Sequence, residues 1–414
     1  MRKLIILSLT AFLLFGCAGQ KYYQSKGVYY PKQPAGELSA MHKFNLTPLP
    51  NSDYNTYSFE GTASSEKYIY CPVRTSYQVG DSTFSFVTIY QISKQDLSVT
   101  DSLVLKSPAN NLTDTHLVLA DSLMIISKAD TLFQIVTADK HLHLGQTYPT
   151  LIKNGDLLYA GMSGAKLRLV IKSPDAQIFM YDFHTNGMAF ERKRLLLKDA
   201  SNMLSCQLTG GWFWLFRGGK SSLETVRFAI QAIDPSPIFN DINYPVQDTT
   251  AVFQVCGIAD STIYISYSAK VANPKAKSGF DDVHRLYVVN SKNSKVENQI
   301  DYNYLGFNLL PKGDKLYLYT AVVSDRIRYK LAEISPDLKL ERELVSFTID
   351  DFSHYSASAN PANCLFFKDN DNFYFTGEYF QKLGTLDKMT YKTVTNAGKF
   401  ALQPQLFLAA YPLP

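Results

Sequence analysis

After residue 16, this sequence of 414 residues contains no long apolar run, and its charges are close to balance. No later segment reaches the about eighteen consecutive apolar residues that a transmembrane helix needs. The 41 lysines and arginines stand against 37 aspartates and glutamates, a net charge of +4, and they are scattered along the chain. Without residues 1–16, which include Arg2 and Lys3 and no acid, the balance is 39 to 37, or +2. Nucleic acid is therefore not an expected partner, because polyanion binding needs a concentrated basic surface.

Cysteine is also scarce, with five residues in the chain, at positions 17, 71, 206, 256 and 364. The four that follow Cys17 lie at least fifty residues apart. This spacing excludes zinc-ribbon and Cys-x-x-Cys sites. Cys206 and Cys256 each precede a similar apolar run, so they are the pair most compatible with a disulfide in an exported protein. We prefer buried free thiols, since cysteine packs in strands as a small apolar residue.

Motifs for catalysis and for metal or nucleotide binding are missing as well. The segment Gly218–Ser221 looks like the end of a phosphate-binding loop, but a tryptophan replaces the earlier glycine of that motif. The segment Asp369–Asn372 resembles the start of a calcium loop but lacks its glycine and final glutamate. His141 and His143 are expected on one exposed strand, as a weak pair without a third metal ligand. No Gly-x-Ser-x-Gly elbow occurs, and the sequence predicts no catalytic residue, no metal site and no cofactor.

The N-terminus has the organisation of a bacterial export signal. Met1–Lys3 is short and basic, and Leu4–Gly16 is an apolar run of thirteen residues, too short to cross a bilayer. The run ends in Leu-Phe-Gly before Cys17, which resembles the lipobox of bacterial lipoproteins. The resemblance implies cleavage before Cys17 and acylation of this cysteine, which would anchor the mature chain to a membrane. An ordinary signal peptide followed by a chance cysteine is the alternative.

The rest of the chain divides into a tether and one domain. Residues 17–43 comprise the lipidated cysteine and a stretch without sustained periodicity, in which Gly, Pro, Gln and Lys stand between tyrosines. Residues 44–414 form the domain. From about Tyr54 onward, short apolar or alternating runs rich in Val, Ile, Tyr, Phe and Thr are broken at short intervals by turn residues. This pattern is typical of an all-β fold.

The apolar runs recur in a fixed order. A short run after a polar turn appears seven times, starting at Lys67, Ser122, Lys166, Trp212, Thr262, Lys315 and Phe373. Each is followed by a second strand, a turn and a more polar strand. The apolar residues that open these turns are 44, 45, 52, 56, 45 and 52 residues apart. A period of about 40–55 residues with four strands per unit indicates a β-propeller.

Seven four-stranded blades account for the domain, and six or eight blades, or two packed β-sandwiches, are the alternatives. A blade that is apolar on both faces cannot stand alone, so blades stack around an axis until the ring closes. We expect closure to pair Thr56–Phe59 with Leu406–Ala409. The repeats lack a Trp-Asp series and a repeated Gly-Gly, and two tryptophans are too few for quinoprotein-type blades.

In a propeller, the loops that join one blade to the next lie on the same face as those between the second and third strands. Ligands usually bind there. The longest such loops are expected at Asp234–Ala251, Ser268–Arg285 and Ser346–Ala362. The candidate binding residues are Lys275, Lys277, Asp281, Asp282, His284, Asp350, Asp351, His354 and Tyr355. Solvated turns account for the two acid pairs in this set, and acid–base catalysis or cation binding is the alternative.

A short motif of Asp, then Ser or Thr, then an apolar residue or Thr is similar to the O-glycosylation motif of exported Bacteroidota proteins. It occurs at Ser82, Ser102, Ser122, Thr131, Thr249 and Ser261, although turns produce the same pattern. With its lipobox, tyrosine-rich tether and degenerate repeats, the whole chain resembles the propeller lipoproteins of the Bacteroidota outer membrane. It departs from their surface-export pattern, because no acidic cluster follows Cys17. This departure favours the periplasmic side over the cell surface.

Three classes of function stay open. The first is a non-catalytic scaffold, attached to the membrane through Cys17, that binds an envelope protein through loops or blade edges. The second is a glycan- or peptide-binding lipoprotein, and the third is a hydrolase or lyase that uses the loop carboxylates. The lack of a catalytic motif favours the first class.

Overall fold

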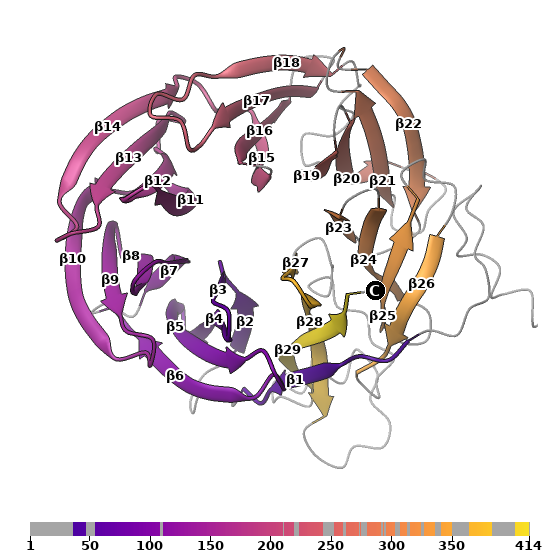
Figure 1. The fold of residues 1–414 in the computed structure, drawn as a ribbon, viewed down its shortest axis with the longest axis horizontal. Helices are drawn as coiled ribbons and strands as arrows, with labels where there is room; N and C mark the ends of the chain where they lie inside the picture. Colours follow the sequence, from indigo (N-terminus) through magenta and orange to yellow (C-terminus); the bar gives the residue numbers. More distant parts are fainter. Residues whose placement is uncertain are drawn as a thin grey trace, which may run out of the picture.

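The computed structural model describes residues 36–46, 54–107, 111–209, 211–218, 223–242, 252–259, 262–272, 274, 280–290, 293, 295–302, 307–312, 315–323, 327–335, 341–349, 364–382 and 402–413. In these ranges the chain forms 29 strands, which make seven sheets around a central axis (Figure 1). The predicted seven-bladed β-propeller is therefore confirmed. No helix in this part of the chain is long and apolar enough to span a membrane.

The strands of blades 1 to 6 follow one another from the centre of the ring to its rim. Blade 1 contains β2 (Tyr54–Phe59), β3 (Ala63–Ser64), β4 (Tyr68–Val79), β5 (Ser82–Ser93) and β6 (Val99–Leu105). Blade 2 contains β7 (Leu112–Leu119), β8 (Leu123–Ala129), β9 (Leu132–Ala138) and β10 (Leu144–Lys153). Blade 3 contains β11 (Asp156–Ser163), β12 (Lys166–Lys172), β13 (Ile178–His184) and β14 (Phe190–Leu197).

The remaining blades repeat this antiparallel order. Blade 4 contains β15 (Met203–Thr209), β16 (Trp212–Gly218), β17 (Leu223–Ala229) and β18 (Ile238–Ile242). Blade 5 contains β19 (Val252–Ala259), β20 (Thr262–Ala272), β21 (Phe280–Asn290) and β22 (Lys295–Tyr302). Blade 6 contains β23 (Phe307–Lys312), β24 (Lys315–Val323), β25 (Ile327–Ile334) and β26 (Glu341–Phe347). Blade 7 contains β27 (Phe366–Lys368), β28 (Asn372–Lys382), β29 (Leu402–Pro412) and, at its rim, β1 (Ala40–Phe44).

The second strand of each blade is the apolar run recognised in the sequence. In β12, which reads Lys-Leu-Arg-Leu-Val-Ile-Lys, the five central residues are all buried. Both faces of such a strand pack against neighbouring blades, so its buried residues are consecutive, and in β12 all of them except Arg168 are apolar. In the outer strand β14, by contrast, exposed residues alternate with half-buried ones over most of its length, as expected for a sheet that meets water at its edge.

Aromatic side chains fill much of the space between blades. Trp214 and Phe216 of blade 4 belong to one cluster with Phe253 of blade 5. Between blades 6 and 7, the ring centroids of Tyr319 and Phe375 are 4.9 Å apart. Each buried aromatic ring removes a large apolar area from water, which holds the blades against one another.

The ring closes through blade 7, but with a different strand from the one predicted. Leu406–Ala409 in β29 pair with β28 and with β1. Thr56–Phe59 in β2 pair instead with β4 of blade 1. The predicted pairing of these two segments is therefore wrong. The N-terminal strand becomes the outer strand of the last blade, and its backbone hydrogen bonds join the two ends of the domain.

Strand β1 lies mostly within the segment expected to be a tether. It has only five residues, and Phe44 is the one that is fully buried, so the strand shows no alternating pattern in the sequence. The Phe44 ring centroid lies 5.5 Å from that of Phe59 in blade 1. The side-chain amide of Gln405 hydrogen-bonds both the N–H and the C=O of Leu46, each at 2.8 Å. The contacts of β1 therefore depend on tertiary structure.

Cysteine packing agrees with the preference for free thiols. Cys206 in β15 carries a free thiol, and burial raises its pKa to about 11. Cys71 in β4 is also free and fully buried. The side chain of Cys256 lies outside the described part of the structure.

Candidate functional site

The β20–β21 hairpin contains three of the predicted binding residues. Asp281, Asp282 and His284 lie within β21, which is paired with β20. The expectation of a loop over Ser268–Arg285 is therefore wrong, because strand pairing satisfies backbone groups that a loop would leave to water. The other candidates, Lys275, Lys277, Asp350, Asp351, His354 and Tyr355, lie outside the described residues. Ligand binding by this set stays a prediction.

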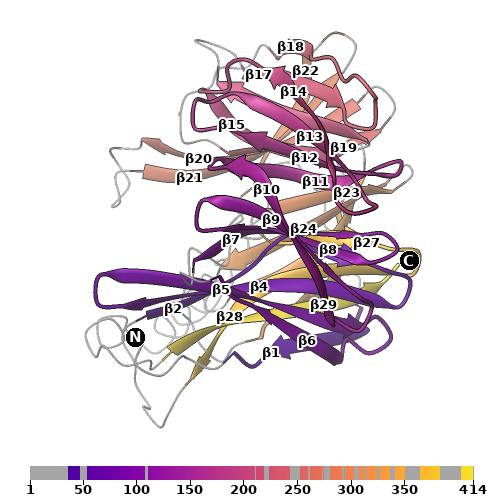
Figure 2. The same cartoon turned by 90° about the vertical axis from the view of Figure 1, so that its left-hand side faces the viewer.

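Long hairpins between second and third strands distinguish some blades from others. The strands of the β4–β5 hairpin have twelve residues each and those of β20–β21 have eleven. The corresponding strands of blades 2, 3 and 4 have seven. β28 and β29 of blade 7 also have eleven residues each. Figure 2 shows the β4–β5 and β20–β21 hairpins projecting from the same side of the ring, on the left. The predicted binding face is therefore the face with the largest protrusions.

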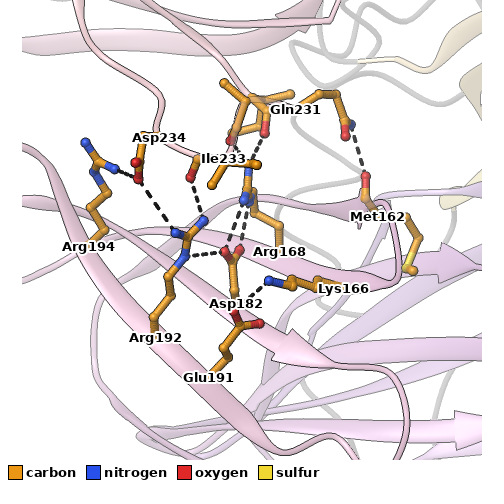
Figure 3. A network of polar contacts seen from close by, with 12 residues as sticks. Met162, Lys166, Arg168, Asp182, Glu191, Arg192, Arg194, Gln231, Ile233 and Asp234 are labelled. Atoms are coloured by element: carbon orange, nitrogen blue, oxygen red, sulfur yellow. Dashed lines mark hydrogen bonds and ion pairs between the residues drawn. The ribbon is translucent and has the colours of Figure 1, made fainter.

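A network of charged side chains connects blade 3 to blade 4 (Figure 3). The Asp182 carboxylate is fully buried and accepts hydrogen bonds from the guanidinium groups of Arg168, at 2.7 and 3.0 Å, and Arg192, at 2.8 Å. Arg168 also donates to the carbonyl of Ala232 at 2.8 Å, and Arg192 to that of Ile233 at 2.6 Å. Both carbonyls belong to the turn between β17 and β18. Arginines of one blade therefore hold a turn of the next.

Asp182, Arg168 and Arg192 form a clamp that holds blade 3 against blade 4, and their chemistry suits this structural role. Burial acts to raise the pKa of Asp182, but hydrogen bonds and charge from Arg168 and Arg192 outweigh burial and lower it. A carboxylate held in its charged form by two arginines is a poor proton acceptor near neutral pH. Asp182 and Arg168 were not among the predicted site residues. The signal in the sequence was a charged residue within each of two otherwise apolar strands, β12 and β13.

At two other blade junctions, the turn between the third and fourth strands also contacts the preceding blade, but through different side chains. Between blades 1 and 2, the side-chain amide of Gln91 donates to the carbonyl of Lys140, in the turn after β9. Between blades 7 and 1, Lys94 Nζ lies 2.9 Å from Asp369 Oδ2. Burial opposes ionisation of Asp369, but hydrogen bonds from Lys94, two backbone N–H groups and Tyr374 lower its pKa to about 2. At three junctions, therefore, the turn between the third and fourth strands of one blade makes polar contacts with the preceding blade.

Glu60 is the described carboxylate whose pKa is raised, mainly by burial, with the Arg74 charge acting in the opposite direction. Raised pKa values are common among catalytic acids. Here, one carboxylate oxygen accepts a hydrogen bond from the Thr115 N–H and the other lies 3.1 Å from Arg74 Nε. Because Thr115 belongs to blade 2, this contact also links two blades.

The histidine pair lies in a different place from the one predicted. His141 and His143 belong to the turn between β9 and β10, and not to a strand. Asp139 organises this turn, because its Oδ1 accepts hydrogen bonds from the N–H groups of both histidines, at 2.8 and 2.9 Å. Its Oδ2 lies 2.9 Å from Nδ1 of His143. Among the described residues, no group of three His, Cys, Asp or Glu side chains could hold a metal ion.

The Asp139 contact is expected to keep His143 protonated to higher pH than an ordinary histidine, because the hydrogen bond and the negative charge raise its pKa. Asp139→Asn should lower the His143 pKa, as measured by NMR titration of the ring protons. The pair supports the turn at low pH, and this support is lost as the pH rises through the folded-state pKa of His143. Asp121→Asn, in another turn, is the control and should leave the His143 titration unchanged.

The O-glycosylation candidates differ in exposure. Ser82, Ser102 and Thr131 are exposed, and Ser122 is half-buried. Thr249 and Ser261 lie outside the described residues. Glycosylation at these positions stays a prediction.

Exposed apolar side chains gather on the rim of blades 1 to 4. On the outer strands these are Val99, Val104, Leu144, Leu151, Phe190, Leu195, Ile238 and Phe239, and Ile233 lies in the turn before β18. Leu151 and Ile233 are the most exposed of them, at 90% and 77%. Apolar groups gathered on a protein surface often mark a site of interaction with another molecule.

The resemblance of this chain to known proteins is distant. No family model matches the chain, and no curated protein matches its sequence. The WD40 repeats of RRP9 align with 94% of this chain and 100% of their own, at 9% identity and a TM-score of 0.44. The Dos1 propeller structure aligns with 77% of this chain over 75% of its own length, at 11% identity and a TM-score of 0.45. BamB from Moraxella catarrhalis aligns with 89% of this chain over 97% of its own length, at 8% identity and a TM-score of 0.37. At these identities the likeness concerns the fold alone.

Proposed function

We propose that this protein is a lipid-anchored, non-catalytic β-propeller that acts as a protein-interaction scaffold in the cell envelope. The observation that carries the interaction role is the series of exposed apolar side chains on the rim of blades 1 to 4. In this proposal Cys17 carries the lipid in the outer membrane. The periplasmic side is favoured, because no acidic cluster follows that cysteine.

The use of charge inside the ring supports a binding role over a catalytic one. Asp182, Asp369 and Glu60 are each held by cations or N–H donors that connect neighbouring blades. Such contacts hold neighbouring blades together, and they occupy carboxylates that a catalytic role would need free. Rigid scaffolds that present loops and edges are a common basis for protein recognition.

The route of the chain into the ring supports an accessible rim. The N–H of Gly36 donates to the carbonyl of Leu344 in β26, and that of Ser39 to the carbonyl of Ala410 in β29. The chain therefore enters the ring at the rim between blades 6 and 7, across the ring from blades 3 and 4 (Figure 1). A tether attached there leaves the rim of blades 3 and 4 free.

Anchoring is tested by substitution of the lipid-bearing cysteine. Cys17→Ala is expected to abolish incorporation of labelled palmitate and to move the protein from the membrane fraction to the soluble fraction. Cys71→Ala is the matched control and should keep the label, since that thiol is buried in blade 1. Absence of label from the unaltered chain would contradict the anchor.

The scaffold role is tested by chemical cross-linking of whole cells that contain the full chain. We expect one defined envelope protein to be joined to it. A chain that stays without a partner but is retained on immobilised glycan would favour the glycan-binding class. Substrate turnover that is lost on Asp281→Ala would favour the hydrolase class.

A further inference from the structure

Blade 4 has an arginine, Arg227, at the position where blade 3 has a carboxylate. Trp214, the third residue of β16, lies directly opposite Arg227 of β17. The corresponding pair in blade 3 is Arg168, the third residue of β12, and Asp182 of β13. There the arginine is paired with the buried Asp182 carboxylate at 2.7 Å. Among the described residues, by contrast, no carboxylate forms an ion pair with Arg227.

The guanidinium of Arg227 rests against the two tryptophans of the chain. Its central carbon lies 4.8 Å from the ring centroid of Trp212 and 5.3 Å from that of Trp214. Attraction to the ring faces positions the cation, but its N–H groups still need acceptors. The Nε–H of Arg227 is buried and has no hydrogen-bond partner. Because Arg227 and Trp212 are each only half-buried, the site has access to the surface.

Two further buried polar atoms lie in the same row. Gln207 of β15 is directly opposite Trp214, so Gln207, Trp214 and Arg227 share one face of blade 4. This face packs against blade 5, since Trp214 belongs to one cluster with Phe253. Trp214 is fully buried and its indole N–H has no partner, and Gln207 Oε1 is also buried without one. Buried polar groups are nearly always hydrogen-bonded, so three unpaired atoms in one row indicate a site for a polar group.

The acids around this row do not neutralise Arg227. Glu224 of β17 and its register partner Asp241 hold positions on the opposite face of blade 4, because successive residues of a strand alternate between faces. Glu224 pairs there with an arginine of β16, and Asp234 in the following turn pairs with arginines of blade 3. At the same end of blade 5, β22 contains one basic and one acidic residue, Lys295 and Glu297. The row therefore keeps one positive charge.

We propose that Gln207, Trp214 and Arg227 bind the carboxylate group of a ligand. A carboxylate brings the charge that Asp182 brings in blade 3, and its two oxygens match the fork of a guanidinium. The Trp214 N–H donates to the same group, and the Gln207 amide can donate as well, since rotation exchanges its oxygen and nitrogen. The site lies near the turn between β15 and β16, on the face of the ring opposite the long hairpins.

Tryptophan fluorescence reports on this site alone, because Trp212 and Trp214 are the two tryptophans of the chain. Acetate is the probe, and it replaces chloride at constant ionic strength in a solution of the full chain carrying Cys17→Ser, which cannot be lipidated. The fluorescence should change with acetate and saturate, and acetate should raise the thermal unfolding midpoint. Arg227→Gln should increase the acetate concentration needed for half-saturation by at least about tenfold.

Two other variants separate carboxylate binding from general effects. Arg217→Gln is the matched control on the opposite face of β16, where Arg217 pairs with Glu224, and it should titrate like the parent chain. Arg227→Lys keeps the charge without the fork, so it should recover only part of the affinity lost in Arg227→Gln. In chloride, Arg227→Gln should unfold no earlier than the parent chain, because it removes a half-buried charge that has no carboxylate beside it.

Fluorescence that does not saturate with acetate, or that saturates equally in Arg227→Gln, would overturn the inference. In cells the carboxylate comes from a free acid or from a side chain of a protein partner. Loss of the whole-cell cross-link in Arg227→Gln would identify a partner side chain, and an unchanged cross-link would identify a free acid. Because the titration uses the isolated chain, its failure is distinct from failure of the scaffold function.

Discussion

Replacement of Asp182 by alanine is expected to lower the free energy of unfolding by about 3–5 kcal/mol. The substitution leaves Arg168, which is only 2% exposed, with a buried charge and no carboxylate beside it. It also takes from Arg192 its buried partner. The whole stability of a domain is about 5–15 kcal/mol, so urea denaturation of the variant should start at a much lower concentration than that of the parent chain.

Two further variants separate the clamp from ordinary surface charge. Asp234→Ala removes a carboxylate that is 67% exposed, and it should cost less than about 1 kcal/mol. The double substitution Arg168→Met with Asp182→Leu should recover much of the stability lost in Asp182→Ala, because it removes both buried charges together. If Asp182→Ala unfolded at the same urea concentration as Asp234→Ala, the clamp would not hold the two blades.

The clamp also makes stability depend on pH. The Asp182 pKa is lowered in the folded chain, so its contribution is complete above the unfolded-state pKa of about 3.9. That contribution is lost as the pH falls toward the folded-state value. Below about pH 4, stability should therefore fall less steeply in Asp182→Ala than in the parent chain.

Removal of β1 is expected to open the ring. A form of the protein that begins at residue 47 lacks the outer strand of blade 7 and its five register pairs with β29. It also loses the Phe44 side chain, and deletion of a buried phenylalanine side chain alone costs about 3–5 kcal/mol in other proteins. We expect a large drop in the thermal unfolding midpoint and rapid hydrogen exchange in β29.

The matched control is a form that begins at Gly36. It keeps β1 and the hydrogen bond from Gly36 to Leu344, so its unfolding midpoint and exchange should equal those of the longer chain. Equal stability of the two truncated forms would show that β1 does not close the ring.

Much of the blade architecture could be predicted from the sequence. The second strand of each blade, such as β12, is buried on both faces, and this demands a run of consecutive apolar residues that stands out between turns. Because that demand recurs in each blade, the number of these runs also predicted the number of blades. Long hairpins were harder to predict, since residues such as Asp281 and His284 look like loop residues but belong to β21.

The contacts between blades could not be predicted, because the same position is filled by different chemistry at each junction. Arg168 holds the turn of the next blade through its backbone carbonyls, Gln91 does so through an amide, and Lys94 pairs with Asp369. No repeated residue marks these contacts, and their partners lie in different blades. A sequence pattern reports what one strand must bury, and it does not report which distant side chain will meet it.

The sequence by itself predicted an all-β fold of seven four-stranded repeats, because burial of both blade faces imposes a local apolar pattern on every repeat. Only the tertiary structure decided that β1 closes the ring and that Asp182 lies between two arginines. Each of these depends on which segments meet in space. A five-residue strand, or one charged residue within an apolar run, carries no local mark of its partner.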